Sequence, residues 1–578
     1  MVMVGAATRR GSSSALRGCV SALRLKKSSA GAGRRSKGSM AAAAVQPDHS
    51  QSQPTTRISG GRKMNLRGRE ETHSVQMRRP SASHYARIGN GVNGQYVADP
   101  RDRQIVNDAV AASQSEDDGL ETSQVHLNVD PAHWLGRGEW DSKTLKEAAS
   151  SHCMATWGPS KVVDSLTRFV KAEGCYLYDE DGKAYLDWTS QAVCSNLGHT
   201  VPESVKGAIA DQLEEVPFMY GGLGLVDARI RLAKLMDELT PEEITGFLFA
   251  SGGGEANEAA IRIARRFSGR HKILTQYRSY HGGTTSALTA TGDFRRFFAE
   301  SGTTGFVKIF NPQPFGFTWG DDDSQKTETC LAILEEQINM EGPETIAAIM
   351  LESIVGAGGA LVPPRGYMEG VRRLCDKYNV LLILDEVMVG FGRTGKFWGF
   401  DHYDNVVPDI VTGAKGLSAA YLPLSVVGVN SKIQEFFREH PLGWGATYAN
   451  HPVALSCAYE VLKHSLDHDL TGNARALEVV MVEELEKIVQ NHSSVRQARA
   501  IGLFGCIDLI GSDGRMIQKY QEPSPSKVLS FKKEMTKNGL IGLFRPPLLH
   551  CAPPLTITEA ELRDGFRRLD LSLKVLDF

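Results

Sequence analysis

Three segments of this 578-residue chain contain residues that could hold an anion and supply a reactive amine. In the first, a short apolar run ending at Phe249 is followed by the glycines 252–254 and then by an alanine-rich stretch with helical character. Glycines let main-chain N–H groups approach an anion, and a helix N-terminus adds favourable partial charge. No Lys-Ser or Lys-Thr pair follows, so this is not a nucleotide-binding P-loop. A flexible turn is the alternative interpretation.

The second segment, residues 390–395, reads Gly-Phe-Gly-Arg-Thr-Gly and matches the GxGxxG pattern of dinucleotide-binding proteins. We reject that interpretation because Asp385 and Glu386 end the preceding strand and three further residues come before the first glycine. A dinucleotide site needs a tight turn from strand to helix, and no helical pattern follows here. A carboxylate at the end of a buried strand instead indicates a cationic partner.

In the third segment, Lys415 follows an apolar run that includes Ile410 and Val411 and lies among small residues. Seen alone, such a lysine is typically an exposed loop charge. Beside an anion-binding turn and an acid-tipped strand, it becomes an amine that can condense with an aldehyde. An amine, an acid for a pyridinium nitrogen and a phosphate cradle are what pyridoxal phosphate requires.

The elements that must position these residues show the pattern of an α/β protein. Short apolar runs alternate with helical patterns between residues 247 and 411, which is typical of a largely parallel sheet covered on both faces. Residues 175–187 alternate around an Asp-Gly pair and predict a β-hairpin. Residues 483–489 are helical in pattern, and short strands follow near 505–510. We predict a large domain with a mostly parallel central sheet, residues 206–465, and a smaller α+β domain from both ends of the globular part, residues 150–205 and 466–578.

Composition excludes several classes of protein. Hydrophobic residues make up 41% of the chain and charged residues 23%, which allows a large core. The net charge of -2 gives no whole-chain field for nucleic acid, and no apolar run is long enough to cross a membrane. The nine cysteines contain no CxxC pair and predict neither a disulfide framework nor a metal site. An enzyme in a reducing compartment is the leading class.

The N-terminal quarter of the chain differs in composition from the rest. Residues 1–47 contain nine Arg or Lys, many Ser and Ala, and no acid, which predicts an organelle transit peptide, mitochondrial in preference to plastid. A basic disordered tail is the alternative. Residues 48–135 are polar with little apolar periodicity, and we predict a low-complexity, disordered linker there.

Residues 384–415 resemble the class-III, or ω-amino-acid, aminotransferases, which are fold-type-I pyridoxal phosphate enzymes. The resemblance extends over residues 150–578, with supporting segments at 280–282, 352–359, 447–452 and 552–555. It implies pyridoxal 5'-phosphate as cofactor. It also implies transfer of an amino group from an ω-amino acid (β-alanine, taurine, GABA-like) or alanine to pyruvate, glyoxylate or 2-oxoglutarate, in a ping-pong mechanism.

The resemblance assigns roles to individual residues. Lys415 would condense with the cofactor aldehyde and then carry a proton, while Asp385 would keep the ring nitrogen protonated. Thr447 would reach the phosphate from a neighbouring subunit, which implies a homodimer with the active site at its interface. The other cofactor contacts would be Gly253 and Gly254 at the phosphate, Tyr280 and Val387 on the two ring faces, His281 beside Tyr280, and Glu352, which would orient Asp385.

Four departures from the family pattern narrow the substrate. Ornithine- and GABA-type members usually have Gln, Glu, Pro and Arg where this chain has Met388, Ala357, Ser353 and His550. The chain therefore resembles more closely the group that includes ω-amino acid:pyruvate, taurine and alanine–glyoxylate aminotransferases.

Three residues are candidates for substrate binding. In that group an arginine binds the acceptor carboxylate, and Arg545 is the matching residue, with a surface arginine as the alternative. Val193 lies in residues 191–194, where the family often has Leu-Trp or similar aromatics, and the loss of a large aromatic would widen or soften the pocket. Trp157 could line the pocket instead, although a core tryptophan is equally compatible with the sequence.

Two other functions remain open at this point. A decarboxylase or aminomutase would use the same cofactor site, and a homologue without catalysis would serve only as a binding partner. The chain retains the residues to which the resemblance assigns chemical roles, and this argues against a homologue without catalysis.

Overall fold

The computed structural model describes residues 4–5, 140–300, 302–519 and 522–578. The described residues divide between two units, one with 4–5 and the described part of 152–578, and the other with 140–151. Within the second unit, the described helix α2 (Ser142–His152), which runs one residue beyond it, buries none of its residues. The predicted transit peptide lies outside the described residues except for β1 (Val4–Gly5), and the predicted linker lies wholly outside them.

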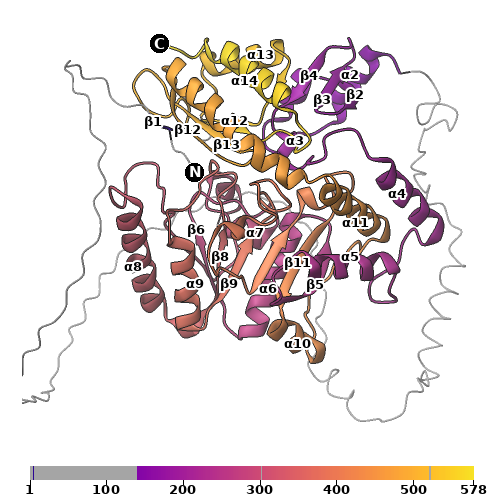
Figure 1. Ribbon diagram of the computed structural model, residues 1–578, viewed down its shortest axis with the longest axis vertical. Coiled ribbons are helices and arrows are strands. Elements are labelled where there is room, and N and C mark those ends of the chain that lie inside the picture. The colour runs from indigo at the N-terminus through magenta and orange to yellow at the C-terminus, as the bar shows by residue number, and fades with distance from the viewer. Residues whose placement is uncertain (1–3, 6–139, 301, 520–521) are drawn as a thin grey trace, which may run out of the picture. The chain divides into compact units, whose positions relative to one another are not determined.

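A seven-stranded sheet forms the centre of the larger unit (Figure 1), with the order β5-β11-β10-β9-β8-β6-β7. Strand β11 runs antiparallel to β5 and β10, and the other neighbouring pairs run parallel. This confirms the predicted α/β fold with a mostly parallel sheet. The strands are β5 (Ile244–Ala250), β6 (Lys272–Gln276), β7 (Phe306–Ile309), β8 (Ile346–Glu352), β9 (Leu381–Asp385), β10 (Ile410–Gly413) and β11 (Ser425–Asn430).

Helices cover both faces of this sheet because its strands are apolar on both sides. In β9, Leu382 and Leu384 pack into one buried cluster, whereas Ile383 packs into another on the opposite face. Alternate residues of a strand point to opposite faces, so the side chain of Asp385 points to the same face of the sheet as that of Ile383. On the Leu382 face lie α5 (Asp227–Glu238), α8 (Asp323–Glu341), α9 (Tyr367–Tyr378) and α11 (Pro452–Asp467), and on the Ile383 face lie α6 (Gly253–Ser268) and α10 (Ser431–Glu439).

The two ends of the globular part meet in a second sheet, β14-β4-β3-β2. The predicted hairpin is confirmed, since Tyr176 in β3 pairs antiparallel with Leu186 in β4. Leu540 in β14 pairs parallel with the same Leu186, and the N-terminal strands lie beside the C-terminal helices in Figure 1. The elements are β2 (Phe169–Glu173), β3 (Tyr176–Asp179), β4 (Ala184–Asp187), β14 (Leu540–Ile541), α13 (Ser526–Lys537) and α14 (Glu559–Leu573).

A third sheet, β1-β12-β13-β16-β15, completes the smaller layer. The predicted helix at 483–489 lies within α12, and the predicted strands near 505–510 correspond to β13. The predicted boundaries between the large and small domains stay predictions, since residues 152–578 form one compact unit. The elements are α12 (Leu470–Asn491), β12 (Val495–Ile501), β13 (Phe504–Leu509), β15 (Phe544–Arg545) and β16 (Leu548–Cys551).

Shorter helices connect these layers. They are η2 (Ser160–Ser165), α3 (Ser190–Val193), α4 (Glu203–Glu215), α7 (Thr285–Ala290), η3 (Phe294–Ala299), η4 (Pro343–Thr345), η5 (Gly399–His402) and η6 (Lys415–Leu417). Of the helices that the structure describes, none has the length and apolar character that a membrane span requires.

Candidate active site

The predicted catalytic residues lie at one edge of the central sheet, where β8, β9 and β10 end side by side. In register, Glu352 pairs with Asp385, and Asp385 pairs with Thr412. Lys415 follows three residues after Thr412, at the start of the short helix η6 and with a positive φ of 49°. In open α/β sheets, ligands bind at the carboxyl ends of the strands. The fold therefore brings Lys415 and Asp385 to one site.

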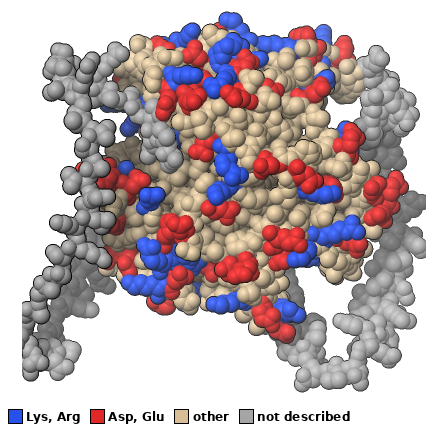
Figure 2. Space-filling view, viewed as in Figure 1, with Lys and Arg blue, Asp and Glu red and all other residues tan. Residues whose placement is uncertain are grey.

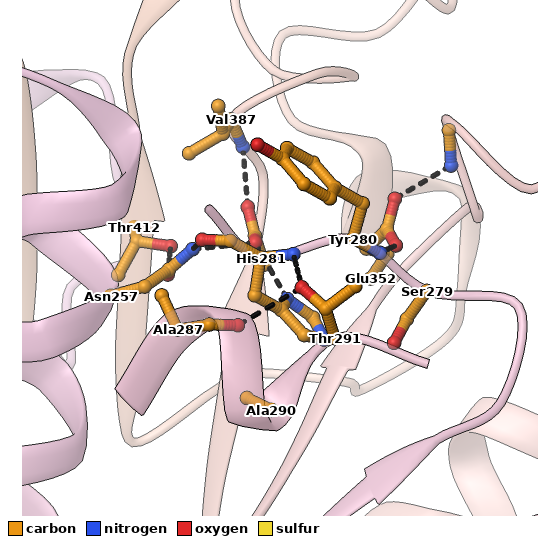
Figure 3. Close-up of polar contacts among 12 residues, drawn as sticks. Asn257, Ser279, Tyr280, His281, Ala287, Ala290, Thr291, Glu352, Val387 and Thr412 are labelled. Atoms are coloured by element: carbon orange, nitrogen blue, oxygen red, sulfur yellow. Dashed lines mark hydrogen bonds and ion pairs between the residues drawn. The ribbon is translucent and has the colours of Figure 1, made fainter. Parts of the chain in front are cut away.

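Three donors fix the buried carboxylate of Asp385. Its Oδ2 accepts hydrogen bonds from Asn257 Nδ2 and His281 Nδ1, both at 2.8 Å, and its Oδ1 accepts from the main-chain N of Val387 at 3.0 Å. The Thr412 hydroxyl donates to Asn257 Oδ1 at 2.8 Å, which sets the orientation of that amide (Figure 3). These three hydrogen bonds therefore fix the orientation of the Asp385 carboxylate.

Asn257 was missed by the sequence analysis. Its signal is a polar residue among the alanines of α6 that pack on the sheet, Ala256, Ala259 and Ala260. A polar side chain on a buried helix face needs a partner in the core. That partner, Asp385, lies 128 residues further along the chain.

His281 is held at both its main chain and its ring. Its main-chain N donates to Thr291 Oγ1 at 2.9 Å, and Thr291 in turn donates to the carbonyl of Ala287 (Figure 3). Its Nδ1 carries the hydrogen that Asp385 accepts, while Nε2 is buried without a hydrogen-bond partner among the described residues. The structure thus places His281 against Asp385, while its predicted contact with the cofactor stays a prediction.

Glu352 anchors the main chain beneath Tyr280. Its carboxylate accepts from the main-chain N of Tyr280 at 3.0 Å and from that of Gly356 at 2.6 Å. Burial raises the pKa of Glu352 to about 7, and the nearby negative charge of Asp385 adds to this effect. Both of these hydrogen bonds go to main-chain N–H groups, so the expected role of Glu352 in orienting Asp385 stays a prediction.

An arginine that the sequence analysis did not select, Arg295, lies over one face of the Tyr280 ring. The guanidinium of Arg295 lies 3.4 Å from the centroid of the Tyr280 ring, and the carboxylate of Asp293 holds that guanidinium in place. Trp157 meets the Tyr280 ring edge-on at 6.1 Å and is 58% exposed. A cation over one ring face fixes the plane of the tyrosine and leaves the other face available for stacking.

The start of α6 forms an anion cradle. Helix α6 begins at Gly253, no side chain caps it, and the first three N–H groups, those of Gly253, Gly254 and Glu255, have no acceptor among the described residues. The Glu255 carboxylate accepts a hydrogen bond from the main-chain N of Ser251 at 2.9 Å. Free N–H groups and the helix dipole favour a phosphate here.

Close packing explains two of the glycines. A Cβ on Gly253 would lie 2.8 Å from Val387 Cγ1. Glycine at this position therefore lets the start of α6 pack against Val387, which lies two residues after Asp385. A Cβ on Gly282 would lie 2.5 Å from the Cα of Gly254. At Gly252, in contrast, a Cβ would meet nothing within 4 Å. The cradle thus borders open space.

The Lys415 amine is prepared to react as a neutral nucleophile. Burial lowers its pKa from 10.5 to about 8, and the positive charge of Arg545 contributes in the same direction. The amine makes no hydrogen bond or ion pair with another residue in the part of the chain that the structure describes. The shift from 10.5 to about 8 raises the neutral fraction at pH 7 by about 300-fold.

The remaining candidates divide into those at the site and those elsewhere. Arg545 lies close enough to Lys415 and His550 that its charge adds to the lowering of their pKa values by burial, and at Tyr280 it opposes the raising of the pKa by burial. Val193 is 2% exposed and packs in an apolar cluster, so its role in the substrate mouth stays a prediction. Thr447 is exposed on this chain and makes no hydrogen bond with another described residue.

These residues fit pyridoxal phosphate. The cradle of α6 suits its phosphate, Asp385 suits its cationic ring nitrogen, and the amine of Lys415 suits its aldehyde. The Tyr280 ring and Val387 are available for its two ring faces.

Comparisons with known proteins agree with this geometry. The family model "Aminotransferase class-III" matches residues 159–573. The taurine–pyruvate aminotransferase of Rhodobacter capsulatus is 32% identical over 432 residues, covering 71% of this chain and 91% of that protein. The probable γ-aminobutyrate transaminase 4 of Oryza sativa subsp. japonica is 30% identical over 422 residues, with 68% and 83% covered.

Solved structures are similar over the same region. A taurine:2-oxoglutarate aminotransferase from Bifidobacterium kashiwanohense, in complex with PLP and glutamate, has a TM-score of 0.71 and 37% identity, covering 76% of this chain and 98% of that one. An (S)-enantioselective ω-transaminase from Thermomicrobium roseum has a TM-score of 0.72 and 33% identity, with 76% and 100% covered.

Proposed function

The chain belongs to the class-III aminotransferases and is a pyridoxal-phosphate-dependent transaminase; we propose that its donor is an ω-amino acid with a single acidic group, of the β-alanine or taurine type. The acceptor is a 2-oxo acid such as pyruvate or 2-oxoglutarate. The observation that carries this proposal is the position of the Arg545 guanidinium close to the reactive amine of Lys415. A guanidinium binds a carboxylate or a sulfonate through two parallel hydrogen bonds.

Each residue of the site has a defined task in this reaction. When bound, the cofactor supplies an aldehyde that takes up the amino group and a ring that withdraws electrons from the donor carbon. Asp385 would place its negative charge beside the ring nitrogen, and the N–H groups of Gly253 and Gly254 would hold the phosphate. The Nζ of Lys415 would accept the proton that leaves the donor carbon and would act as the proton donor later in the reaction. Arg545 holds the acidic group of donor and acceptor in turn.

His550 distinguishes this site from that of the GABA-type relatives and so supports a donor of the β-alanine or taurine type. It is fully buried, its Nε2 donates a hydrogen bond to the Gly356 carbonyl at 3.1 Å, and burial lowers its pKa to about 4. It is therefore neutral at physiological pH and supplies no second fixed cation where GABA-type relatives carry arginine. The Met388 side chain packs closely against Gly356, the residue whose carbonyl contacts His550, and reduces the space there.

We expect Arg545→Gln to raise KM for taurine, β-alanine and 2-oxo acids by about 10–100-fold, since a charge-assisted bidentate contact is lost. A matrix of donors and acceptors, measured with wild type and variant, tests this. An amine without an acidic group serves as control, because its KM should change little. Equal KM values for acidic substrates in the two proteins would contradict the proposal. Turnover without any oxo acceptor, or release of carbon dioxide, would indicate the decarboxylase or aminomutase instead.

We also propose that the enzyme is a homodimer in which Thr447 contacts the phosphate held by the partner subunit. The exposed position of Thr447 and of the neighbouring Tyr448, 67% exposed, supports this. Thr447→Ala should weaken cofactor affinity about tenfold or more, through one lost bond to a charged group.

Mixed dimers test the proposed sharing of the site. In a dimer of a Thr447→Ala chain with a Lys415→Ala chain, one site would combine Lys415 with an intact Thr447 from the partner subunit. We expect that site to bind the cofactor with wild-type affinity. Affinity as weak as that of the Thr447→Ala homodimer would show that Thr447 acts within its own chain, and wild-type affinity of that homodimer would show that Thr447 does not contact the phosphate.

For localisation, we propose the mitochondrion, with the plastid as the alternative. The acid-free, Arg-rich composition of residues 1–47 supports this. One relative, from Oryza sativa, is named "Gamma-aminobutyrate transaminase 1, mitochondrial". Residues 1–50 fused to a fluorescent reporter should direct it to mitochondria, and a cytosolic signal would contradict the proposal.

A further inference from the structure

A second cavity lies on the side of α6 that faces away from the sheet. It has a volume of about 700 Å³, and the loop 441–443 forms part of its wall. The alanines and isoleucines of α6 pack on the sheet, whereas its arginines Arg262, Arg265 and Arg266 line this cavity together with Arg270. The cavity shares no lining residue with the cofactor site described above.

The charges around this cavity are unbalanced. The four guanidinium groups face a single carboxylate, that of Glu258, which leaves a formal charge of +3. Glu258 is itself engaged, because its Oε1 accepts hydrogen bonds from the main-chain N of Ser286 and Ala287. On the face shown in Figure 2, basic and acidic side chains are intermixed.

None of the four arginines forms an ion pair with a carboxylate among the described residues. Arg266 donates to the Pro441 carbonyl at 3.2 Å, and Arg262 donates to that of Gly443. Arg265 donates to the carbonyls of His271 and Thr304, and Arg270 donates to those of Pro343, Ile346 and Asn379. A guanidinium has five N–H donors, so Arg262 and Arg266, both exposed, keep most of theirs for a ligand.

We propose that this cavity binds a small ligand that carries a diphosphate group, either free or on a nucleoside. Guanidinium forks match the geometry of phosphate oxygens, and several of them around one space favour a group with several negative charges. The volume lies in the range of small-molecule sites. The ligand would also neutralise arginines that hold the loop 441–443, which leads on to Thr447.

The full-length enzyme loaded with cofactor is the protein to test, because its own phosphate site is then occupied. Isothermal titration with inorganic diphosphate should show one site per chain. In the double variant Arg262→Gln/Arg266→Gln, we expect affinity to fall at least tenfold. Arg515→Gln/Arg567→Gln changes the net charge equally at exposed positions elsewhere and should bind as wild type does.

Titration with ADP distinguishes the two sources of the diphosphate. Tighter binding of ADP than of diphosphate would indicate a nucleotide, and weaker binding would indicate the free ion; both support the site. No binding of either, or equal affinity in the Arg262→Gln/Arg266→Gln variant, would overturn the proposal. A variant that changes the oligomeric state, with unchanged diphosphate binding, would show instead that the arginines contact another protein chain.

Discussion

Lys415→Ala is expected to lower kcat/KM by about 10⁴-fold or more, because the same amine acts as nucleophile and as general base. The variant should also lose the visible absorbance that the wild type shows with cofactor. Its fold should persist, since the amine makes no hydrogen bond or ion pair with another described residue. Thermal unfolding of the variant checks that point.

Two further variants separate the reaction of the amine from its charge. Lys415→Arg keeps a cation but offers no neutral amine at physiological pH, so it should be as inactive as Lys415→Ala. Lys432→Ala removes an exposed lysine and should retain wild-type activity. Visible absorbance or turnover in Lys415→Ala would contradict the assignment.

The low pKa of Lys415 adds a dependence on pH. Because burial lowers that pKa to about 8, the neutral amine accumulates as pH rises through 8. The rate at which cofactor-free enzyme recombines with pyridoxal phosphate should therefore rise up to about pH 8 and then level off. A rate that still rises tenfold per pH unit above pH 9 would show an amine with an ordinary pKa.

Asp385→Asn is expected to lower kcat by about 10²–10³-fold, since it removes the negative charge that the ring nitrogen needs. The amide keeps the size of the carboxylate, but it now presents a donor toward Asn257 and His281, which are themselves donors to this group. Some loss of cofactor affinity should accompany the loss of kcat. Single-turnover transfer from donor to cofactor measures the chemical step directly.

The adjacent acid provides a matched control. Glu386 is fully buried, its carboxylate accepts from the Ser353 hydroxyl and from the main-chain N of Gly399, and burial raises its pKa to about 8. It is therefore largely protonated at pH 7, and Glu386→Gln should retain activity within about tenfold. Equal losses of activity in Asp385→Asn and Glu386→Gln would mean that neither carboxylate is specific to the cofactor.

Local sequence was sufficient to predict the chemistry and the fold class. Glycines before an alanine-rich helix, an acid at a strand end and a lysine after the next strand are local patterns that a single reading of the chain can detect. The alternation of buried strands and helices likewise follows from apolar periodicity, which depends on neighbours in sequence. Lys415, Asp385 and the glycine cradle were identified in this way.

Only the tertiary structure decided which side chains hold those residues in place. The strand 381–385 is apolar on both faces, so its sequence does not show whether Asp385 or Glu386 faces α6. Asn257, Thr412 and Arg295 gained their roles from contacts with elements far away in the chain. Hydrogen bonds of this kind depend on which elements pack together, and packing is a property of the whole core that short-range sequence patterns do not contain.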